Sequence, residues 1–151
     1  MTVSSPSIWS ALGIVALSLM LLAASWFDMR TRRIPNSVVG LGALAGLTWT
    51  LSPVGPGLWM SVLGGLVAFL TFWVLHGLGW MGAGDVKLAG ATGLYFTPSH
   101  ALALCLTIFI AGGVMALIWR CSPRAGLQDT IPYGVAIALG TAWHVWRQAG
   151  L

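Results

Sequence analysis

Three carboxylic acids are the only acidic side chains in the 151 residues of this chain, and two of them could work together chemically. They are Asp28, Asp85 and Asp129, and the sequence contains no glutamate. Asp28 closes a long apolar run, and Asp85 interrupts another one. An ionisable residue beside hydrocarbon is costly, so its presence indicates a function by default.

Two neighbouring carboxylates in a medium of low dielectric cannot both ionise, so they share a proton and titrate as a pair. The ionised member can take a proton from a water molecule, which then attacks a peptide carbonyl. The protonated member can donate to the carbonyl oxygen. This chemistry needs no metal or cofactor, so Asp28 and Asp85 predict an aspartic-protease mechanism.

Each aspartate also has a purely structural interpretation. Asp28 could cap its helix or pair with Arg32, and Asp85 could be a helix N-cap with Lys87 as a solvating neighbour. Gly82 and Gly84 make the second site more specific, because glycines beside a carboxylate let the backbone unwind and let an extended substrate strand approach. Asp129 stands in a polar loop without a motif, where we expect it only to solvate the loop.

Composition defines the surroundings of these acids. The chain is 58% hydrophobic and 7% charged, whereas a soluble domain carries about 25% charged residues. Lipid is therefore the expected solvent, and the net charge of +4 suits basic loops that face an anionic leaflet. No basic patch interleaved with aromatic residues suggests nucleic-acid binding. We expect one helical domain over residues 1–151, without a separate soluble domain.

The hydropathy pattern predicts an all-α polytopic membrane protein with about six transmembrane helices. The first apolar run is followed by Arg30, Arg32 and Arg33, which form a stop-transfer signal, and no basic residue precedes it as in a signal peptide. The fourth segment is short and fits either a tilted span or a half-embedded helix. The expected segments are 8–27, 37–51, 58–79, 86–96, 101–119 and 131–146.

The basic residues predict the topology. With the N-terminus outside, six of the seven lie inside and only Arg147 lies outside. This orientation places Asp28 and Asp85 at the same, cytoplasmic face of the membrane. The six are Arg30, Arg32, Arg33, Lys87, Arg120 and Arg124.

The cysteines and histidines do not predict a metal site. Cys105 and Cys121 form no Cys-x-x-Cys pair. His76, His100 and His144 fall in different segments, which favours packing or interfacial roles.

Three motifs together resemble the type IV prepilin peptidases. The first is Phe27-Asp28 followed by Arg32-Arg33-Ile34-Pro35-Asn36, the second is 82–88 (GAGDVKL), and the third is 131–136 (IPYGVA). The similarity runs from the first expected helix to the last. It implies an aspartic endopeptidase of the inner membrane that cuts pilin precursors where a basic cytoplasmic leader meets the hydrophobic pilin helix.

The resemblance implies that Asp28 and Asp85 are the catalytic pair. It gives supporting positions to Gly82, Gly84, Lys87, Pro35, Asn36, Pro132, Tyr133 and Gly134. Larger family members carry a cytoplasmic insertion with paired Cys-x-x-Cys motifs and also methylate the new N-terminus. This chain has only residues 30–36 as its first loop, so it resembles the short form of the tight-adherence (Flp) pilus systems, and methylation is not expected.

Three other functions remain open from the residues. One is a non-catalytic assembly scaffold, for which Asp→Asn changes would be silent. A presenilin-like protease also uses Gly-x-Gly-Asp, but it cuts inside the bilayer. Asp28 lies beside three arginines, which places the expected site near the membrane surface. A small ion-coupled transporter could use Asp28 and Asp85 as ion ligands. An inverted repeat in such a transporter would place equivalent acids on opposite faces of the membrane. Asp28 and Asp85 are expected at the same face, which counts against this function. The oligomeric state and the pilin that is cut do not follow from the sequence.

Overall fold

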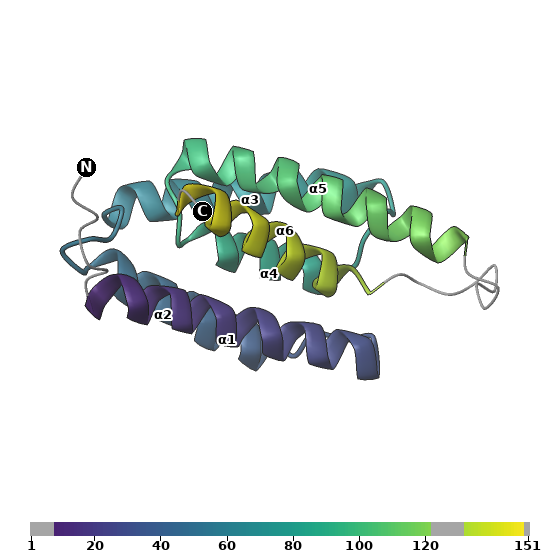
Figure 1. Cartoon of the computed structure of the whole chain (residues 1–151), viewed down its shortest axis with the longest axis horizontal. Coiled ribbons are helices and arrows are strands. Elements are labelled where there is room, and N and C mark those ends of the chain that lie inside the picture. The colour runs from purple at the N-terminus through teal and green to yellow at the C-terminus, as the bar shows by residue number, and fades with distance from the viewer. Residues whose placement is uncertain (1–7, 122–131, 150–151) are drawn as a thin grey trace.

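A computed structural model describes residues 8–121 and 132–149, and these residues form six α-helices without a strand (Figure 1). The all-helical class predicted from hydropathy is confirmed. The helices are α1 (Ile8–Thr31), α2 (Asn36–Thr50), α3 (Leu58–Gly77), α4 (Ala83–Gly93), α5 (Pro98–Arg120) and α6 (Tyr133–Gln148).

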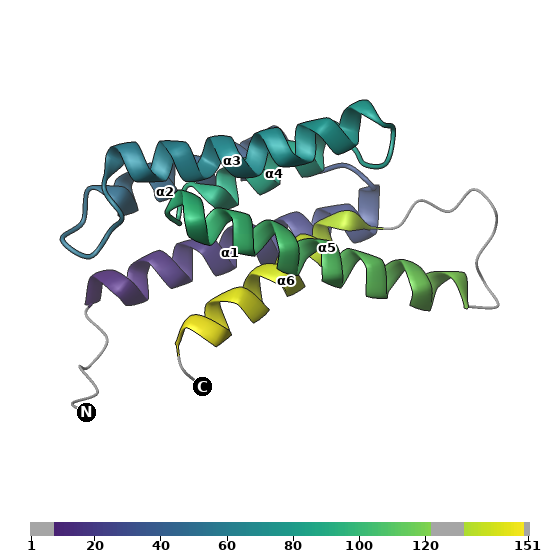
Figure 2. The ribbon, with the colours of Figure 1, turned by 90° about the horizontal axis from the view of Figure 1, so that it is seen from above.

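Consecutive helices run back and forth, so the chain connections gather at two ends of the bundle (Figures 1 and 2). One end holds the α1–α2 and α3–α4 connections and the start of α6. The other end holds the α2–α3 and α4–α5 connections, the start of α1 and the end of α6. The short helix α4 is central, packing against α2, α3, α5 and α6.

The exterior of the bundle is apolar, as expected for a protein in lipid. Large side chains such as Leu19, Leu70 and Leu106 are more than half exposed, whereas water-soluble proteins rarely expose extensive apolar surface. Among the described helices, α1, α3 and α5 are long and apolar enough to cross a membrane. The 11 residues of α4 extend only about 16 Å, roughly half the hydrocarbon thickness.

The expected boundaries differ most around α4 and α5. We predicted that α4 begins after Asp85, but it begins at Ala83, so Gly84 and Asp85 are helical. Residues 97–100 fall between two expected segments, yet α5 begins at Pro98 because proline is well tolerated in the first turn of a helix. The loop 120–130 predicted before α6 lies largely outside the described residues, as does Asp129.

Glycines allow α3 and α4 to pack closely. A Cβ at Gly64 would overlap the carbonyl oxygen of Phe96 and lie 2.7 Å from that of Gly93. A Cβ at Gly93 would in turn lie 2.6 Å from the Gly64 oxygen. Backbone atoms cannot move aside as a flexible side chain can. This contact therefore fixes how α4 sits in the bundle.

We expect Gly64→Ala to destabilise the folded protein by about 1–3 kcal/mol, because the added methyl group forces the two backbones apart. The measurement is thermal unfolding of the purified protein in detergent. Gly77→Ala is the matched control, since it adds the same methyl group to α3 where nothing lies within 4 Å. Equal melting temperatures for the two variants would contradict the close packing.

Candidate active site

Asp28 lies in the last turns of α1 and is held by the beginning of α6. Its side chain is only 7% exposed. Its Oδ2 atom accepts a hydrogen bond of 2.8 Å from the backbone N–H of Gly134. The first N–H groups of a helix have no partner within the helix and favour a negative charge, so α6 can stabilise an ionised Asp28. Ser25 donates to the Gly134 carbonyl over 3.3 Å, which adds a second link between the two helices.

The contact between Asp28 and the start of α6 requires a glycine at position 134. A Cβ there would lie 2.9 Å from Oδ2 of Asp28 and 3.2 Å from its Cβ. A side chain at this position would displace the carboxylate. Gly134 therefore contributes a hydrogen bond and the space in which Asp28 is seated.

Asp85 lies in the first turn of α4, where its carboxylate is half buried. Its Oδ2 atom accepts a hydrogen bond of 3.2 Å from the N–H of Gly82, the N-cap residue. Asp85 therefore takes part in capping the helix, as its structural interpretation predicted. The N-cap residue is Gly82, however, and Asp85 accepts the hydrogen bond from the N–H of that residue. Burial and the charge of Asp28 raise the pKa of Asp85 from 3.8 to about 6, against the opposing effect of the Gly82 N–H.

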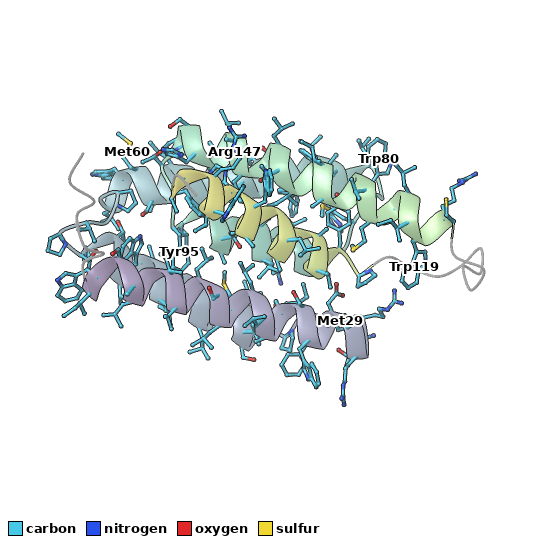
Figure 3. The ribbon with its side chains drawn as sticks, viewed as in Figure 1. Met29, Met60, Trp80, Tyr95, Trp119 and Arg147 are labelled. Atoms are coloured by element: carbon cyan, nitrogen blue, oxygen red, sulfur yellow. The ribbon has the colours of Figure 1, made fainter. Side chains whose placement is uncertain are left out.

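Both aspartates line one cavity of about 680 Å³ at the same end of the bundle. Trp80 forms part of its wall, and Figure 3 places Trp80, Trp119 and Met29 at this end. Met29 directly follows Asp28 in the sequence. The remaining lining residues come from the α1–α2 connection, from the end of α3, from the α3–α4 connection, from α5 and from the start of α6. They are Arg32, Leu75, Gly79, Met81, Gly82, Phe109, Gly112, Gly113, Ala116 and Tyr133.

This arrangement suits acid–base chemistry. The raised pKa of Asp85, about 6, favours its protonated form in weakly acidic conditions, while Asp28 is positioned by the backbone N–H of Gly134. A cavity that holds one acid and one base can activate water against a polarised carbonyl. No group of three or more His, Cys, Asp or Glu side chains that could hold a metal occurs in the described ranges.

The structure separates the predicted supporting residues into three groups. Gly82 and Tyr133 line the cavity, and Gly134 contacts Asp28 directly. The second group links two helices. Lys87 donates a hydrogen bond of 3.1 Å to Oδ1 of Asn36, and this bond joins α4 to the start of α2.

The remaining motif residues shape the helix ends. Pro35 is the N-cap of α2, and Pro132 is the N-cap of α6. Gly84 packs against Ile34. A Cβ added at position 84 would lie 3.5 Å from the Cβ of Ile34. These three residues are not among those that line the cavity.

Sequence reasoning missed the wall that α5 contributes. Gly112, Gly113 and Ala116 face the cavity, and the adjacent glycines in an otherwise apolar helix were the available signal. It also missed the position of Arg32. This residue has a positive φ of 53°, lines the cavity, and lies with its guanidinium 5.9 Å from the Trp119 ring.

Known proteins with similar sequences all point to one family. A prepilin leader peptidase/N-methyltransferase of Xanthomonas campestris is 27% identical over 145 residues, covering 91% of this chain and 50% of its own length. Enzymes of the same name are 29% identical over 140 residues in Burkholderia pseudomallei (88% and 45% covered) and 28% identical over 145 residues in Myxococcus xanthus (87% and 43% covered). The chain thus spans about half the length of the curated relatives it matches.

No solved structure is detectably similar to the chain. The family model of the type IV leader peptidases matches residues 15–119. This range runs from α1 through α5 and includes both aspartates of the cavity. The chain belongs to the type IV leader peptidase family.

Proposed function

We propose that this chain is a membrane-embedded aspartic endopeptidase that removes the basic leader peptide from type IV prepilins of the Flp type. The observation that carries the proposal is the single cavity lined by Asp28 and Asp85, in which burial and the charge of Asp28 raise the pKa of Asp85. Family membership supports the choice of prepilins as substrates, because the curated relatives are named prepilin leader peptidases.

In the proposed reaction, ionised Asp28 accepts a proton from water as the oxygen attacks the scissile carbonyl. Protonated Asp85 donates to the carbonyl oxygen, giving a neutral tetrahedral intermediate. Collapse of the intermediate breaks the C–N bond, and the leaving amine takes its proton from Asp28. The gem-diol returns a proton to Asp85 as the new acid forms, so both aspartates regain their starting states.

The test of the proposal uses purified protein and a synthetic prepilin segment with its basic leader and the first turns of its hydrophobic helix. We expect one cut at the junction, detected by mass spectrometry.

We also propose that the new N-terminus stays unmethylated, because no paired Cys-x-x-Cys motif stands in the sequence. An added methyl group on the product would contradict this second part alone. A cut within the hydrophobic helix would instead favour a presenilin-like protease.

We further propose that the two aspartates face the cytoplasm, supported by the six-to-one distribution of basic residues. Reporter fusions after Arg33 and after Arg124 are expected to be cytoplasmic, and a fusion after Gly57 is expected to be external. A periplasmic signal after Arg33 or Arg124 would contradict this orientation.

Cleavage is expected to decline as the pH rises above about 6, because Asp85 must carry a proton to act as the acid. The folded-state pKa of Asp85 is raised, so its protonated form is lost on the alkaline side. At low pH the rate should fall again as the base becomes protonated, giving a bell-shaped profile of kcat/KM. A rate that stays flat to pH 9 would contradict the role of Asp85.

A chelator is expected to leave cleavage unchanged. Loss of cleavage in EDTA, restored by zinc, would indicate a metal mechanism instead.

A further inference from the structure

Three nitrogen-bearing side chains meet at the end of the bundle away from the two aspartates. His100 lies in the first turn of α5, and His144 and Gln148 lie one turn apart at the end of α6. The Nε2 atom of Gln148 is 2.7 Å from Nδ1 of His100 and 2.6 Å from Nε2 of His144. Figure 3 labels Arg147, which directly precedes Gln148, on this part of the bundle.

The hydrogen bonding in this cluster has a chemical consequence. A carboxamide nitrogen donates hydrogen bonds but accepts none, so each ring nitrogen that it contacts must present a lone pair. Two imidazole lone pairs from different helices therefore converge on one electropositive group. A cation with affinity for nitrogen can take the place of that group.

We propose that His100, His144 and Gln148 form a binding site for a divalent transition-metal ion such as Cu²⁺, Ni²⁺ or Zn²⁺. Neutral imidazole is a preferred ligand of these ions. A half-turn of the Gln148 carboxamide exchanges Nε2 for Oε1 and offers a third donor atom. Water completes the coordination shell on the open side, where His100 and Gln148 are exposed.

The surroundings hold the cluster in place. His144 is only 6% exposed, and its ring packs edge-on against Phe96 at 5.4 Å and against His100 at 6.0 Å. Because one ring nitrogen lies 2.7 Å and the other 2.6 Å from the same atom, their separation cannot exceed the sum of these two distances. Two metal–nitrogen bonds of about 2.0–2.1 Å require a separation of no more than about 4 Å. Movement of the exposed His100 ring can supply the difference. A bound ion would link the start of α5 to the end of α6.

Sequence reasoning predicted only packing or interfacial roles for these histidines, because they lie in different segments. The spacing of His144 and Gln148 by four residues places both on one helix face. The contribution of His100 depends on how α5 and α6 pack against each other, which the sequence does not reveal.

The test measures metal binding by the full chain in detergent, purified with a tag that contains no histidine and stripped of metal. With Cu²⁺ as the probe, electron paramagnetic resonance should show about one bound ion with nitrogen ligands. His100→Ala and His144→Ala should each lower the affinity at least about tenfold, because loss of even a hydrogen-bond partner of a metal ligand typically costs about 10–100-fold. His76→Ala is the matched control, since His76 contacts the Met81 carbonyl at the opposite end and should leave binding unchanged.

Gln148→Glu keeps the proposal testable if the buried His144 variant fails to fold. A carboxylate in place of the amide supplies a charged oxygen ligand, so copper affinity should rise by about tenfold or more and the metal should increase Tm further. A cluster that is only hydrogen-bonded also accommodates the carboxylate, because each imidazole can present an N–H to it, but its copper affinity would not rise. Copper binding that is unaffected by His100→Ala, or not strengthened by Gln148→Glu, would overturn the proposal. Neither outcome depends on the proposed peptidase activity.

Discussion

Asp28→Asn and Asp85→Asn are each expected to reduce prepilin cleavage by at least about 10³-fold, at the upper range of general acid–base effects. Asparagine at position 28 cannot accept the proton of water, and asparagine at position 85 cannot donate the proton that polarises the carbonyl. Both variants should remain folded. An asparagine Oδ1 can still accept the N–H bond of Gly134 or of Gly82. The measurement is cleavage of the synthetic prepilin segment by each purified variant.

Asp129→Asn is the matched control, because it removes the same charge from a residue outside the three motifs. It should cleave as the wild type does. Substantial cleavage by Asp28→Asn or by Asp85→Asn would end the aspartic-protease hypothesis. Equal loss in all three variants with poor membrane yield would show that the acids are structural.

The second large effect is expected from Gly134→Ala. The added methyl group would lie 2.9 Å from Oδ2 of Asp28, so the carboxylate must move away from the first turn of α6. A misplacement of about 1 Å can cost on the order of 100-fold in rate, which is the loss we expect in kcat. The fold should persist, since alanine is favoured over glycine inside a helix. Cleavage assays and melting curves measured on the same sample separate the two effects.

Gly40→Ala is the control for this variant. Gly40 is exposed on α2 with nothing within 4 Å of an added Cβ, so the same substitution should leave kcat unchanged. Wild-type activity in Gly134→Ala would mean that the seating of Asp28 against α6 is unimportant for the reaction. A loss of activity that is matched by an equal loss of folded protein would assign Gly134 to packing alone.

The helices could be predicted from the sequence because lipid imposes a simple pattern on a membrane chain. Long apolar runs must become helices so that every backbone polar group is satisfied. The start of α3 at Leu58 was therefore predicted correctly, and that of α2 at Asn36 to within one residue. The predicted start of α4 is wrong because glycines favour an unwound backbone only where nothing stabilises the helix, whereas Asp85 stabilises a helical first turn by accepting the Gly82 N–H.

The two aspartates could be proposed from their rarity and motifs, but their environment could not. The approach of Gly134 to Asp28 joins residues 106 positions apart in the chain. The α5 wall of the cavity likewise depends on how helices pack. Packing between membrane helices is set by close contacts of small residues, which hydropathy does not encode. The His100–Gln148 contact was missed for the same reason, since it joins two helices across 48 positions.

The most direct test of the central claim is co-expression of the chain with a candidate Flp prepilin in cells that lack other prepilin peptidases. The account predicts that the prepilin shifts to a smaller species on a gel when the wild-type chain is present. It also predicts that the prepilin stays uncut when the chain carries Asp28→Asn or Asp85→Asn at equal membrane levels. A shift that persists in either variant would contradict the account.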